Sequence, residues 1–346
     1  MSARFPPLGA IVGDNGTTFR VWATAAERVT VRLFAAGVDE RPLARAGGGI
    51  FEATFRDVGP GALYKLALDD RELPDPYARF LPSGVHGPAE VAATFASPAL
   101  PRVALDRLVV YELHVGTFTP EGTYRAASER LGYLRDLGVT AIEIMPLAAF
   151  PGSRGWGYDG VAGFAPYAPY GRREDLRAFV AAAHAHRLAV LLDVVYNHFG
   201  PVGNYLGAYA REYFDHDAAN AWGGAPDFAC DAMRAYVVAN ARMWLDEFGF
   251  DGLRLDATHA IVDRSAVHIV AEIAAAAHAA SPPRLVVAED DRNDATLVTE
   301  LGVDAVWADD FHHQLRVLLA GDRDGYYAAY EPRVDALART IERGWL

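Results

Sequence analysis

An arginine and an aspartate interrupt an otherwise apolar stretch, FDGLRLDAT, at residues 250–258. Side chains alternate across a strand, so Arg254 and Asp256 share one face while Leu253 and Leu255 share the other. A structural ion pair is one explanation, but a buried pair often loses as much in desolvation as it gains in Coulomb energy. The pattern therefore favours a catalytic carboxylate held by a guanidinium at the end of a strand.

Two other apolar runs end in residues of the same kind. In LAVLLDVVYNH, residues 188–198, Asp193 and Asn197 share a strand face and His198 stands at the strand end. The run VVAED carries Glu289 at its end. Neighbouring strands would bring these polar groups to one site.

The carboxylates of Asp256 and Glu289 would then follow adjacent strands, near an arginine, a histidine and an asparagine. Such a pair fits glycoside hydrolysis, in which one carboxylate attacks the anomeric carbon and the other protonates the leaving oxygen. We expect Arg254 to keep Asp256 ionised and an apolar wall to keep Glu289 protonated. Trp156 and Tyr158, in GWGYDG, offer aromatic faces on which sugar rings can stack. Each residue alone has an ordinary structural explanation, so the prediction depends on their combination and order.

The elements that would position these residues begin near residue 106, where strand and helix patterns alternate. The spacing of apolar residues predicts helices at 131–137, ending at Gly138, at 173–187 and at 231–248. Six runs read as parallel strands buried on both faces: RLVVYELHV, VTAIEIMP, LAVLLDVVYNH, FDGLRLDAT, RLVVAEDD and VDAVWADD. Polar residues stand at the C-terminal ends of these runs, where a parallel barrel has its active site: His114, Asp193, Asn197, Asp256, Glu289 and Asp309.

The fold class is therefore expected to be α/β with a parallel barrel. A doubly wound open sheet is the alternative, but no G-x-G-x-x-G pattern follows the first strand, so a dinucleotide enzyme has little support. The first hundred residues instead contain short strand-like runs between turn signals: TTFRVWAT, RVTVRLFA, GIFEATF and ALYKLALDD. We expect an immunoglobulin-like β-sandwich over residues 1–100 and a catalytic barrel over residues 101–346.

Composition excludes several classes of protein. The 346 residues carry a formal net charge of -13 without a basic run, so binding to nucleic acid would lack its main driving force. Prolines interrupt the N-terminus before any signal-peptide core, and no segment approaches the roughly 18 apolar residues of a membrane span, so we expect a cytoplasmic protein. Cys230 is the single cysteine, which excludes an internal disulfide and makes an inert thiol the expected state.

These motifs resemble a known family. DVVYNH, DGLRLDAT and VVAED are similar to the first three signature regions of the α-amylase superfamily, glycoside hydrolase family 13, which consists of retaining enzymes with a (β/α)8 TIM barrel. The resemblance covers nearly the whole chain, because the N-terminal sandwich resembles the family's starch-binding-type module. Within the superfamily, YELHVGTFTPEGTY, GWGYDG, DGLRLDATHAI, AEDDRN and DDFHH most resemble the subfamily that acts on maltooligosyltrehalose.

The resemblance assigns roles to individual residues. It implies Asp256 as the nucleophile and Glu289 as the general acid/base. It also implies residues that contact the sugar: Tyr158, Asp193, His198 and Arg254. We add Trp156, Asp309 and His312 as further candidates for substrate binding. The resemblance implies no cofactor and no metal, because this subfamily generally lacks the superfamily's calcium site, and Asn197 is expected to hold its loop instead.

One signature region has no counterpart. The superfamily's fourth region, a His-Asp pair after the seventh strand that supplies a third catalytic carboxylate, is not found before Leu346, and Asp309 and Asp310 do not have its position. We therefore expect about six βα units of a C-terminally incomplete barrel, and no useful activity from residues 1–346 alone.

The sequence thus predicts hydrolysis of the α-1,4 bond next to the terminal trehalose of maltooligosyltrehalose, or of a related α-glucan, with release of trehalose. A glycogen branching enzyme shares the predicted sandwich and barrel and is the nearest alternative. A second alternative is a non-catalytic fragment that binds glucan without cleaving it, because the third carboxylate is missing.

Overall fold

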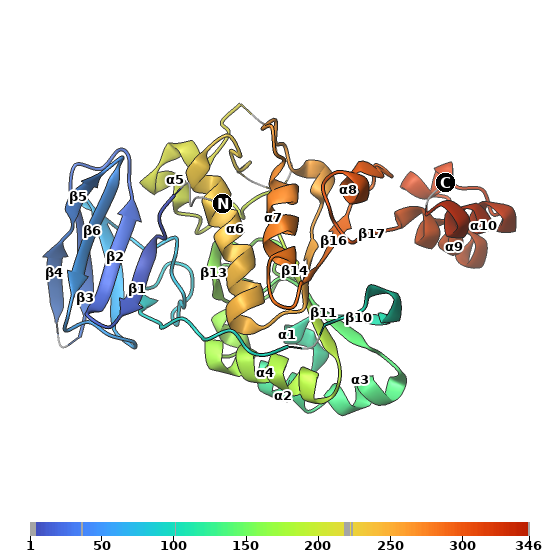
Figure 1. The fold of residues 1–346 in the computed structure, drawn as a ribbon, viewed down its shortest axis with the longest axis horizontal. Coiled ribbons are helices and arrows are strands. Elements are labelled where there is room, and N and C mark those ends of the chain that lie inside the picture. The colour runs from blue at the N-terminus through green and yellow to red at the C-terminus, as the bar shows by residue number, and fades with distance from the viewer. Residues whose placement is uncertain (1–4, 36, 101, 218–221, 223, 345–346) are drawn as a thin grey trace.

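The structure is a computed structural model that describes residues 5–35, 37–100, 102–217, 222 and 224–344. Three of the four predicted domain boundaries, at Met1, residue 101 and Leu346, lie outside these ranges, and the domain boundaries stay predictions. Figure 1 shows a β-sandwich at one end, an α/β unit in the middle and a pair of helices at the other end.

The N-terminal region consists of two antiparallel sheets. Its strands are β1 (Gly9–Gly13), β2 (Gly16–Trp22), β3 (Val29–Phe34), β4 (Val38–Pro42), β5 (Ala44–Gly47), β6 (Ile50–Phe55), β7 (Leu63–Leu68), β8 (Arg71–Leu73) and β9 (Ala89–Glu90). One sheet has the order β1-β2-β6-β5 and the other the order β4-β3-β7-β8, with β9 pairing with β7. The four predicted strand-like runs correspond to β2, β3, β6 and β7, so the predicted β-sandwich is confirmed.

Alternation along the strands explains why the two sheets pack together. In β3, Val29, Val31 and Leu33 are buried and the residues between them are half-exposed. Phe19 of β2 and Tyr64 of β7 meet edge to face across the two sheets, with ring centroids 4.9 Å apart. A period of two in hydrophobicity therefore builds one apolar core between the sheets.

The second region is built on a curled sheet of parallel strands. They are β10 (Val110–Leu113), β11 (Ala141–Ile144), β14 (Ala189–Val194), β15 (Gly252–Leu255), β16 (Leu285–Glu289) and β17 (Ala305–Trp307), and a separate hairpin pairs β12 (Ala148–Ala149) with β13 (Ala162–Pro166). The strand order β10-β11-β14-β15-β16-β17 follows the chain without reversal. A doubly wound sheet would reverse its order, so the barrel arrangement with six strands is confirmed.

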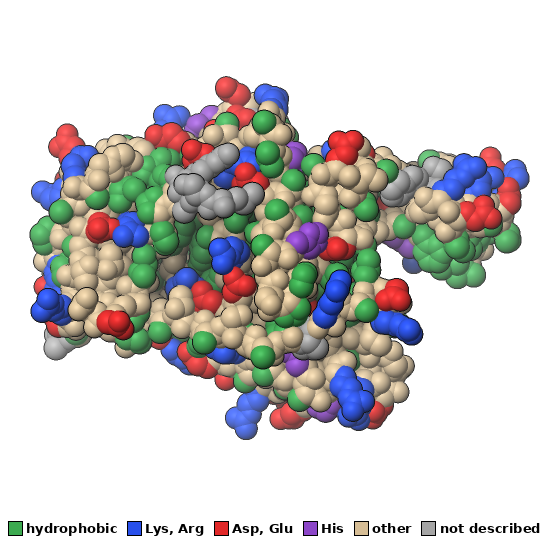
Figure 2. Space-filling model, viewed as in Figure 1, with side chains coloured by type: hydrophobic (Ala, Val, Ile, Leu, Met, Phe, Trp, Pro, Cys, Tyr) green, Lys and Arg blue, Asp and Glu red, His purple; other side chains and the backbone are tan. Residues whose placement is uncertain are grey.

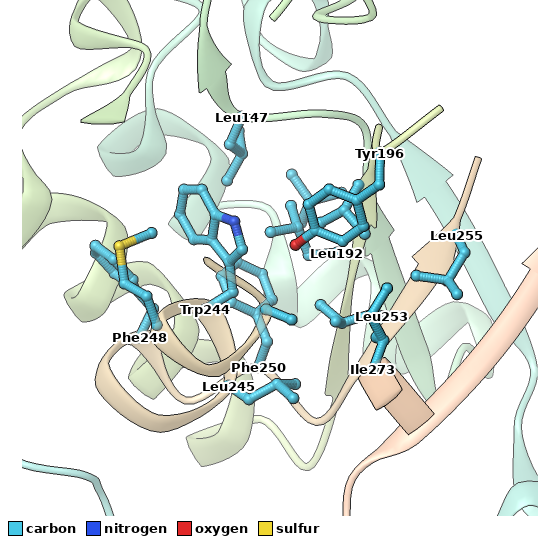
Figure 3. Close-up of a cluster of buried hydrophobic side chains, with 14 of the residues drawn as sticks. Leu147, Leu192, Tyr196, Trp244, Leu245, Phe248, Phe250, Leu253, Leu255 and Ile273 are labelled. Carbon is cyan, nitrogen blue, oxygen red and sulfur yellow. The ribbon is translucent and has the colours of Figure 1, made fainter. Parts of the chain in front are cut away.

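The two faces of this sheet differ in character. Its outer face carries apolar side chains that pack on the surrounding helical segments. Figure 3 shows this packing for Leu192, Leu253 and Leu255 of the strands and for Trp244, Leu245, Phe248, Phe250 and Ile273 outside the sheet. Because side chains alternate, burial of the outer face turns Glu143, Asp193 and Arg254 to the inner face of the sheet.

Helices join or follow the strands, and several of them pack on the outer face of the sheet. They are α1 (Val115–Phe118), α2 (Tyr124–Ser128), α3 (Leu131–Leu137), α4 (Arg173–Ala185), α5 (Leu206–Tyr209), α6 (Asp231–Arg242), α7 (Ile269–His278), α8 (Thr296–Thr299), α9 (Asp309–Ala320) and α10 (Val334–Arg343). The predicted helix stops are confirmed at Gly138, with φ of 96°, and at Gly249, with φ of 81°. The last six residues before Gly249, Met243–Phe248, form a π-helical turn.

Similar histidine–aspartate pairs occur at the N-terminal ends of two of the parallel strands. His184 Nε2, in α4, lies 2.8 Å from Asp251 Oδ2, and the same oxygen accepts a hydrogen bond of 2.8 Å from the Val190 N–H. His278, in α7, lies 3.0 Å from Asp304, which accepts in the same way from the N–H of a β16 residue. Each aspartate therefore ties a helix end to the start of a strand.

We expect Asp251→Ala to lower the free energy of unfolding by about 2–4 kcal/mol, because it leaves a buried N–H and a partly buried histidine without their acceptor. The side chain of Asp251 is 1% exposed. Chemical denaturation measures the loss. The control is Asp246→Ala, whose carboxylate is 36% exposed and pairs with Arg242, and this change should cost less than about 0.5 kcal/mol. Equal losses in the two variants would contradict the structural role of Asp251.

The last two helices, α9 and α10, form a unit that projects from the sheet, at the right in Figure 1. Several of the large apolar residues of this unit are exposed: Leu319, Tyr326, Val334 and Ile341. Figure 2 shows hydrophobic side chains gathered on its lower side. Within the described ranges, no helix combines the length and the apolar character needed to cross a membrane.

Candidate active site

The candidate site is organised around one arginine. Arg254, on β15, is 6% exposed, and its Nη1 donates to Asp193 Oδ1 at 2.9 Å and to Asp256 Oδ1 at 2.7 Å. Its Nη2 lies 3.4 Å from Glu289 Oε2. Asp193 stands opposite Arg254 in the register of β14 and β15, and Glu289 ends the next strand. The structure therefore brings together the four charged residues that the sequence placed at neighbouring strand ends.

Charge and burial act against each other in this group. Burial raises the pKa of Asp193 to about 7, and the Arg254 guanidinium opposes this shift. Burial acts to lower the pKa of Arg254, but the charges of Asp193, Asp256 and Glu289 raise it overall. The indole of Trp307 covers the guanidinium, with 4.9 Å between Arg254 Cζ and the ring centroid. Arg254 therefore stays charged, and its contacts hold it rigidly between the carboxylates.

A second set of contacts holds Asp256. Asn197 Nδ2 donates to Asp256 Oδ2 at 2.8 Å and to its main-chain oxygen at 2.9 Å. Although β14 ends at Val194, Asn197 still reaches Asp256 from the loop that follows. Asn197 was expected to hold its own loop, and the structure shows that it joins this loop to Asp256.

The turn after Asp256 contains a strained residue. Ala257 has φ of 43°, in the left-handed region that residues other than glycine seldom adopt. Its N–H donates to Glu289 Oε2 at 2.7 Å. The strained turn therefore links the segment that carries Asp256 to the carboxylate of Glu289, and such strain is common at functional sites.

The surroundings of Glu289 differ from the apolar wall that we expected. Its Oε2 receives the Ala257 N–H and faces the Arg254 guanidinium, and its side chain is 26% exposed. The sequence contains no signal for the Ala257 donor, because its position depends on the backbone turn at that residue. A proton on this carboxyl must therefore reside on the other oxygen, Oε1.

Two of the expected sugar contacts lie at the site. The hydroxyl of Tyr158 donates to Asp193 Oδ2 at 2.8 Å, and burial raises the pKa of Tyr158 so that it stays protonated. His198 is buried beside Asn197, and its Nδ1 is in hydrogen-bond contact with the Asn197 Oδ1. Burial lowers the pKa of His198, which favours the neutral imidazole.

The other expected contacts are less closely connected to the cluster. Trp156 is 69% exposed. Asp309 and His312 lie in the first turn of α9, beyond the end of β17, and their side chains face each other at 3.9 Å. Among the described residues, their ion-pair and ring contacts lie within α9, so the role of these two residues at the sugar stays a prediction.

The structure adds an aromatic residue that the sequence analysis did not select. Trp222 is 51% exposed, and its ring lies over His198 with 5.7 Å between centroids and a tilt of 36°. An exposed indole beside a polar cluster is a suitable platform for a sugar ring. No spacing pattern connects Trp222 to His198, so the sequence carried no signal for it.

Two groups of described residues could hold a metal ion by geometry, and one of them lies in the segments that follow β15 and β16. His259, Asp290 and Asp291 have ligand atoms within 4.8 Å of one another. Asp290, however, already accepts hydrogen bonds from Thr258 and from Arg292. An ion-pair network accounts for these residues without a metal.

Elsewhere, burial raises the pKa of the Cys230 thiol, in line with the expected inert thiol.

Comparisons with known proteins agree with this geometry. The family model described as "Alpha amylase, catalytic domain" matches residues 73–222, and "Carbohydrate-binding module 48 (Isoamylase N-terminal domain)" matches residues 7–78. A solved structure titled as a putative alpha amylase from Salmonella typhimurium superimposes with a TM-score of 0.90 at 38% identity, covering 99% of this chain and 60% of that one.

Sequence relatives narrow the family. The malto-oligosyltrehalose trehalohydrolase of Deinococcus radiodurans is 55% identical over 344 residues, 98% of this chain and 57% of that protein. The enzyme of the same name from Saccharolobus solfataricus is 41% identical, over 93% of this chain and 59% of its own length. A 1,4-alpha-glucan branching enzyme of Jannaschia sp. is 32% identical over 74% of this chain. The chain thus spans less than three fifths of the first two relatives. It belongs to the malto-oligosyltrehalose trehalohydrolase family of the α-amylase superfamily.

Proposed function

We propose that the protein hydrolyses the α-1,4-glucosidic bond next to the terminal trehalose of maltooligosyltrehalose and releases trehalose. The observation that carries the proposal is the contact of one guanidinium with both Asp256 and Glu289, in a chain 55% identical to a trehalohydrolase. Trehalose biosynthesis in the cytoplasm is part of the proposal, and cell fractionation tests the location.

The geometry supports a two-step mechanism with retention of configuration. Asp256 attacks the anomeric carbon of the glucosyl unit whose leaving oxygen belongs to trehalose. Arg254 places positive charge 2.7 Å from Asp256 Oδ1, which stabilises the carboxylate before attack. Glu289 Oε1 gives its proton to the leaving oxygen, and the resulting carboxylate then takes a proton from the water that opens the glycosyl–enzyme ester.

Asp193 and Tyr158 have a positioning and binding role in this mechanism. Asp193 cannot act as a free base, because Arg254 and Tyr158 occupy both of its oxygens. Its carboxylate is instead a fixed acceptor for sugar hydroxyls at the inner end of the site. Trp222 and Tyr158 supply ring faces near that position.

Incubation of the full-length protein with maltooligosyltrehalose tests the proposal. Free trehalose is the expected product. A branched polymer with little trehalose would identify a branching enzyme. Binding of the oligosaccharide without turnover would identify a glucan-binding protein. Either of these two results would overturn the proposed reaction.

We expect Tyr158→Phe to lower kcat/KM about 10- to 100-fold, because a hydrogen bond to an ionised acceptor contributes about 1.5–3 kcal/mol. The variant keeps the ring and loses only the hydroxyl that donates to Asp193. Steady-state kinetics measures the change. The control is Tyr133→Phe, at a side chain that is 63% exposed, and it should behave as wild type. An unchanged kcat/KM in Tyr158→Phe would show that the Asp193 contact has no role in the reaction.

A further inference from the structure

A buried carboxyl that the mechanism does not use lies on the inner face of the sheet. Glu143, on β11, is 1% exposed, and among the described residues its Oε1 has no hydrogen-bond partner. An isolated buried carboxylate is costly to keep ionised, because the interior cannot replace the water that solvates it. Glu143 therefore needs a partner, a metal ion or a proton.

Two further carboxylates surround Glu143. Glu112 stands directly opposite it in the register of β10 and β11, and Asp193 lies on the other side, on β14. Oxygen atoms of the three groups lie within 4.8 Å of one another. The positive group acting on Glu143 is Arg254, on β15, which already donates to Asp193 and Asp256. One shared guanidinium does not neutralise three close carboxylates, so one of them must hold a proton.

The distribution of donors identifies the protonated group. Asp193 accepts from Arg254 at 2.9 Å and from the Tyr158 hydroxyl at 2.8 Å, and these donors stabilise its anion. Glu112 is exposed, so water can solvate its charge. Among the described residues, no donor reaches Glu143 Oε1, and the side chain is almost fully removed from the surface. Burial and the negative charge of Asp193 raise the pKa of Glu143 to about 8, against a lowering by Arg254.

We propose that Glu143 holds a proton at neutral pH and acts as a positioning residue, whose neutral carboxyl keeps Arg254 between Asp193, Asp256 and Glu289. The catalytic part of this inference depends on the function proposed above, and the protonation does not. A negative charge on Glu143 would repel Asp193 and draw the guanidinium towards β11, away from Asp256 and Glu289. Ionisation of Glu143 would thus disturb the nucleophile without contact between Glu143 and the substrate.

Infrared difference spectroscopy in D2O tests the protonation directly. The wild-type protein at pH 7 should show the carbonyl stretch of protonated carboxylic acids, and Glu143→Gln should lose the share of this band that belongs to Glu143, while the share of Asp193, whose pKa is also raised, remains. The matched control Glu112→Gln, which changes the exposed member of the same trio, should retain the band. Identical spectra for wild type and Glu143→Gln would overturn the proposal. Stoichiometric metal that is found in the wild type and lost in Glu143→Gln would also overturn it.

Stability against pH gives a second readout that does not depend on catalysis. Between the ordinary glutamic acid pKa of about 4.3 and about 8, the folded protein holds a proton that the unfolded chain has released. Stability from this group is present at low pH and is lost as pH rises through the folded pKa. The unfolding constant of wild type should therefore rise about tenfold per pH unit relative to that of Glu143→Gln in this window. A constant ratio would contradict the proposal.

The positioning role is tested with an α-maltooligosyl fluoride, whose leaving group needs no proton from Glu289. Above about pH 8, the rate of fluoride release should fall in wild type and stay level in Glu143→Gln. Parallel profiles would show that Glu143 does not position Arg254. If both proteins leave the fluoride intact while the infrared band is present, the proposed function fails and the protonation of Glu143 stands.

Discussion

Asp256→Asn should abolish turnover of maltooligosyltrehalose while the fold remains intact. The change replaces the attacking oxygen by an amide of the same size, and loss of a nucleophile commonly costs on the order of 10³-fold or more in kcat. The amide oxygen can still accept from Arg254, and the main-chain oxygen of residue 256 still accepts from Asn197. Only the contact between Asn197 Nδ2 and Oδ2 of residue 256 is lost. In the variant, an amide nitrogen takes the place of this oxygen, so two donors would face each other.

The measurement combines trehalose release with thermal unfolding. Asp136→Asn removes the same charge from the exposed face of α3 and serves as the control, which should keep wild-type activity. A melting temperature near that of wild type shows that the loss in Asp256→Asn is chemical and not structural. Activity of Asp256→Asn within tenfold of wild type would mean that another group attacks the sugar.

Much of the fold could be predicted because burial imposes a regular pattern. A strand buried on one face alternates, as β3 does, and a parallel strand buried on both faces is nearly continuously apolar, as β14 is apart from Asp193. Gly138 and Gly249 marked helix ends because glycine adopts the left-handed conformation at low cost. The π-helical turn at Met243–Phe248 left no such mark, since its apolar residues continue the helical stripe of α6.

The charged centre of the site was predictable for the same reason. Asp193, Arg254 and Asp256 lie at strand ends, and the period of two fixes the face to which each side chain points. Glu143 lies on the same inner face but inside an apolar run. The role proposed for it depends on the lack of a donor to its Oε1 among the described residues, which no single sequence shows. Trp222 could not be found because its position depends on a loop that has no regular period.

Asp309 and His312 show what a sequence motif does not specify, which is the direction of the element that carries it. Both residues follow β17 in the sequence, as a residue at the active end of a barrel strand would. The backbone enters α9 at Asp309, and the helix carries these side chains in its own first turn. A motif therefore fixes the order of residues along the chain, whereas the direction of α9 decides where these side chains lie, and their contact with the sugar stays a prediction.

Glu289→Gln should separate proton donation from nucleophilic attack. Hydrolysis of maltooligosyltrehalose should fall on the order of 10²- to 10⁴-fold, the usual contribution of a general acid. Release of fluoride from an α-maltooligosyl fluoride should continue for one turnover, because fluoride leaves without a proton and Asp256 is unchanged. The amide oxygen of the variant can still accept the Ala257 N–H, which at 2.7 Å holds the turn after Asp256.

Detection of the covalent intermediate then tests the role of Glu289 most directly. Without the carboxylate of Glu289, water attacks the glycosyl–enzyme ester slowly, so the ester to Asp256 should accumulate and be visible by mass spectrometry of the intact protein. Azide, which needs no general base, should restore turnover and give a glycosyl azide of retained configuration. Glu300→Gln, at an exposed glutamate after α8, is the control and should match wild type on both substrates. A fluoride substrate as inert as the natural one would remove Glu289 from the role of acid, because a variant that lacks only the proton donor must still allow Asp256 to attack.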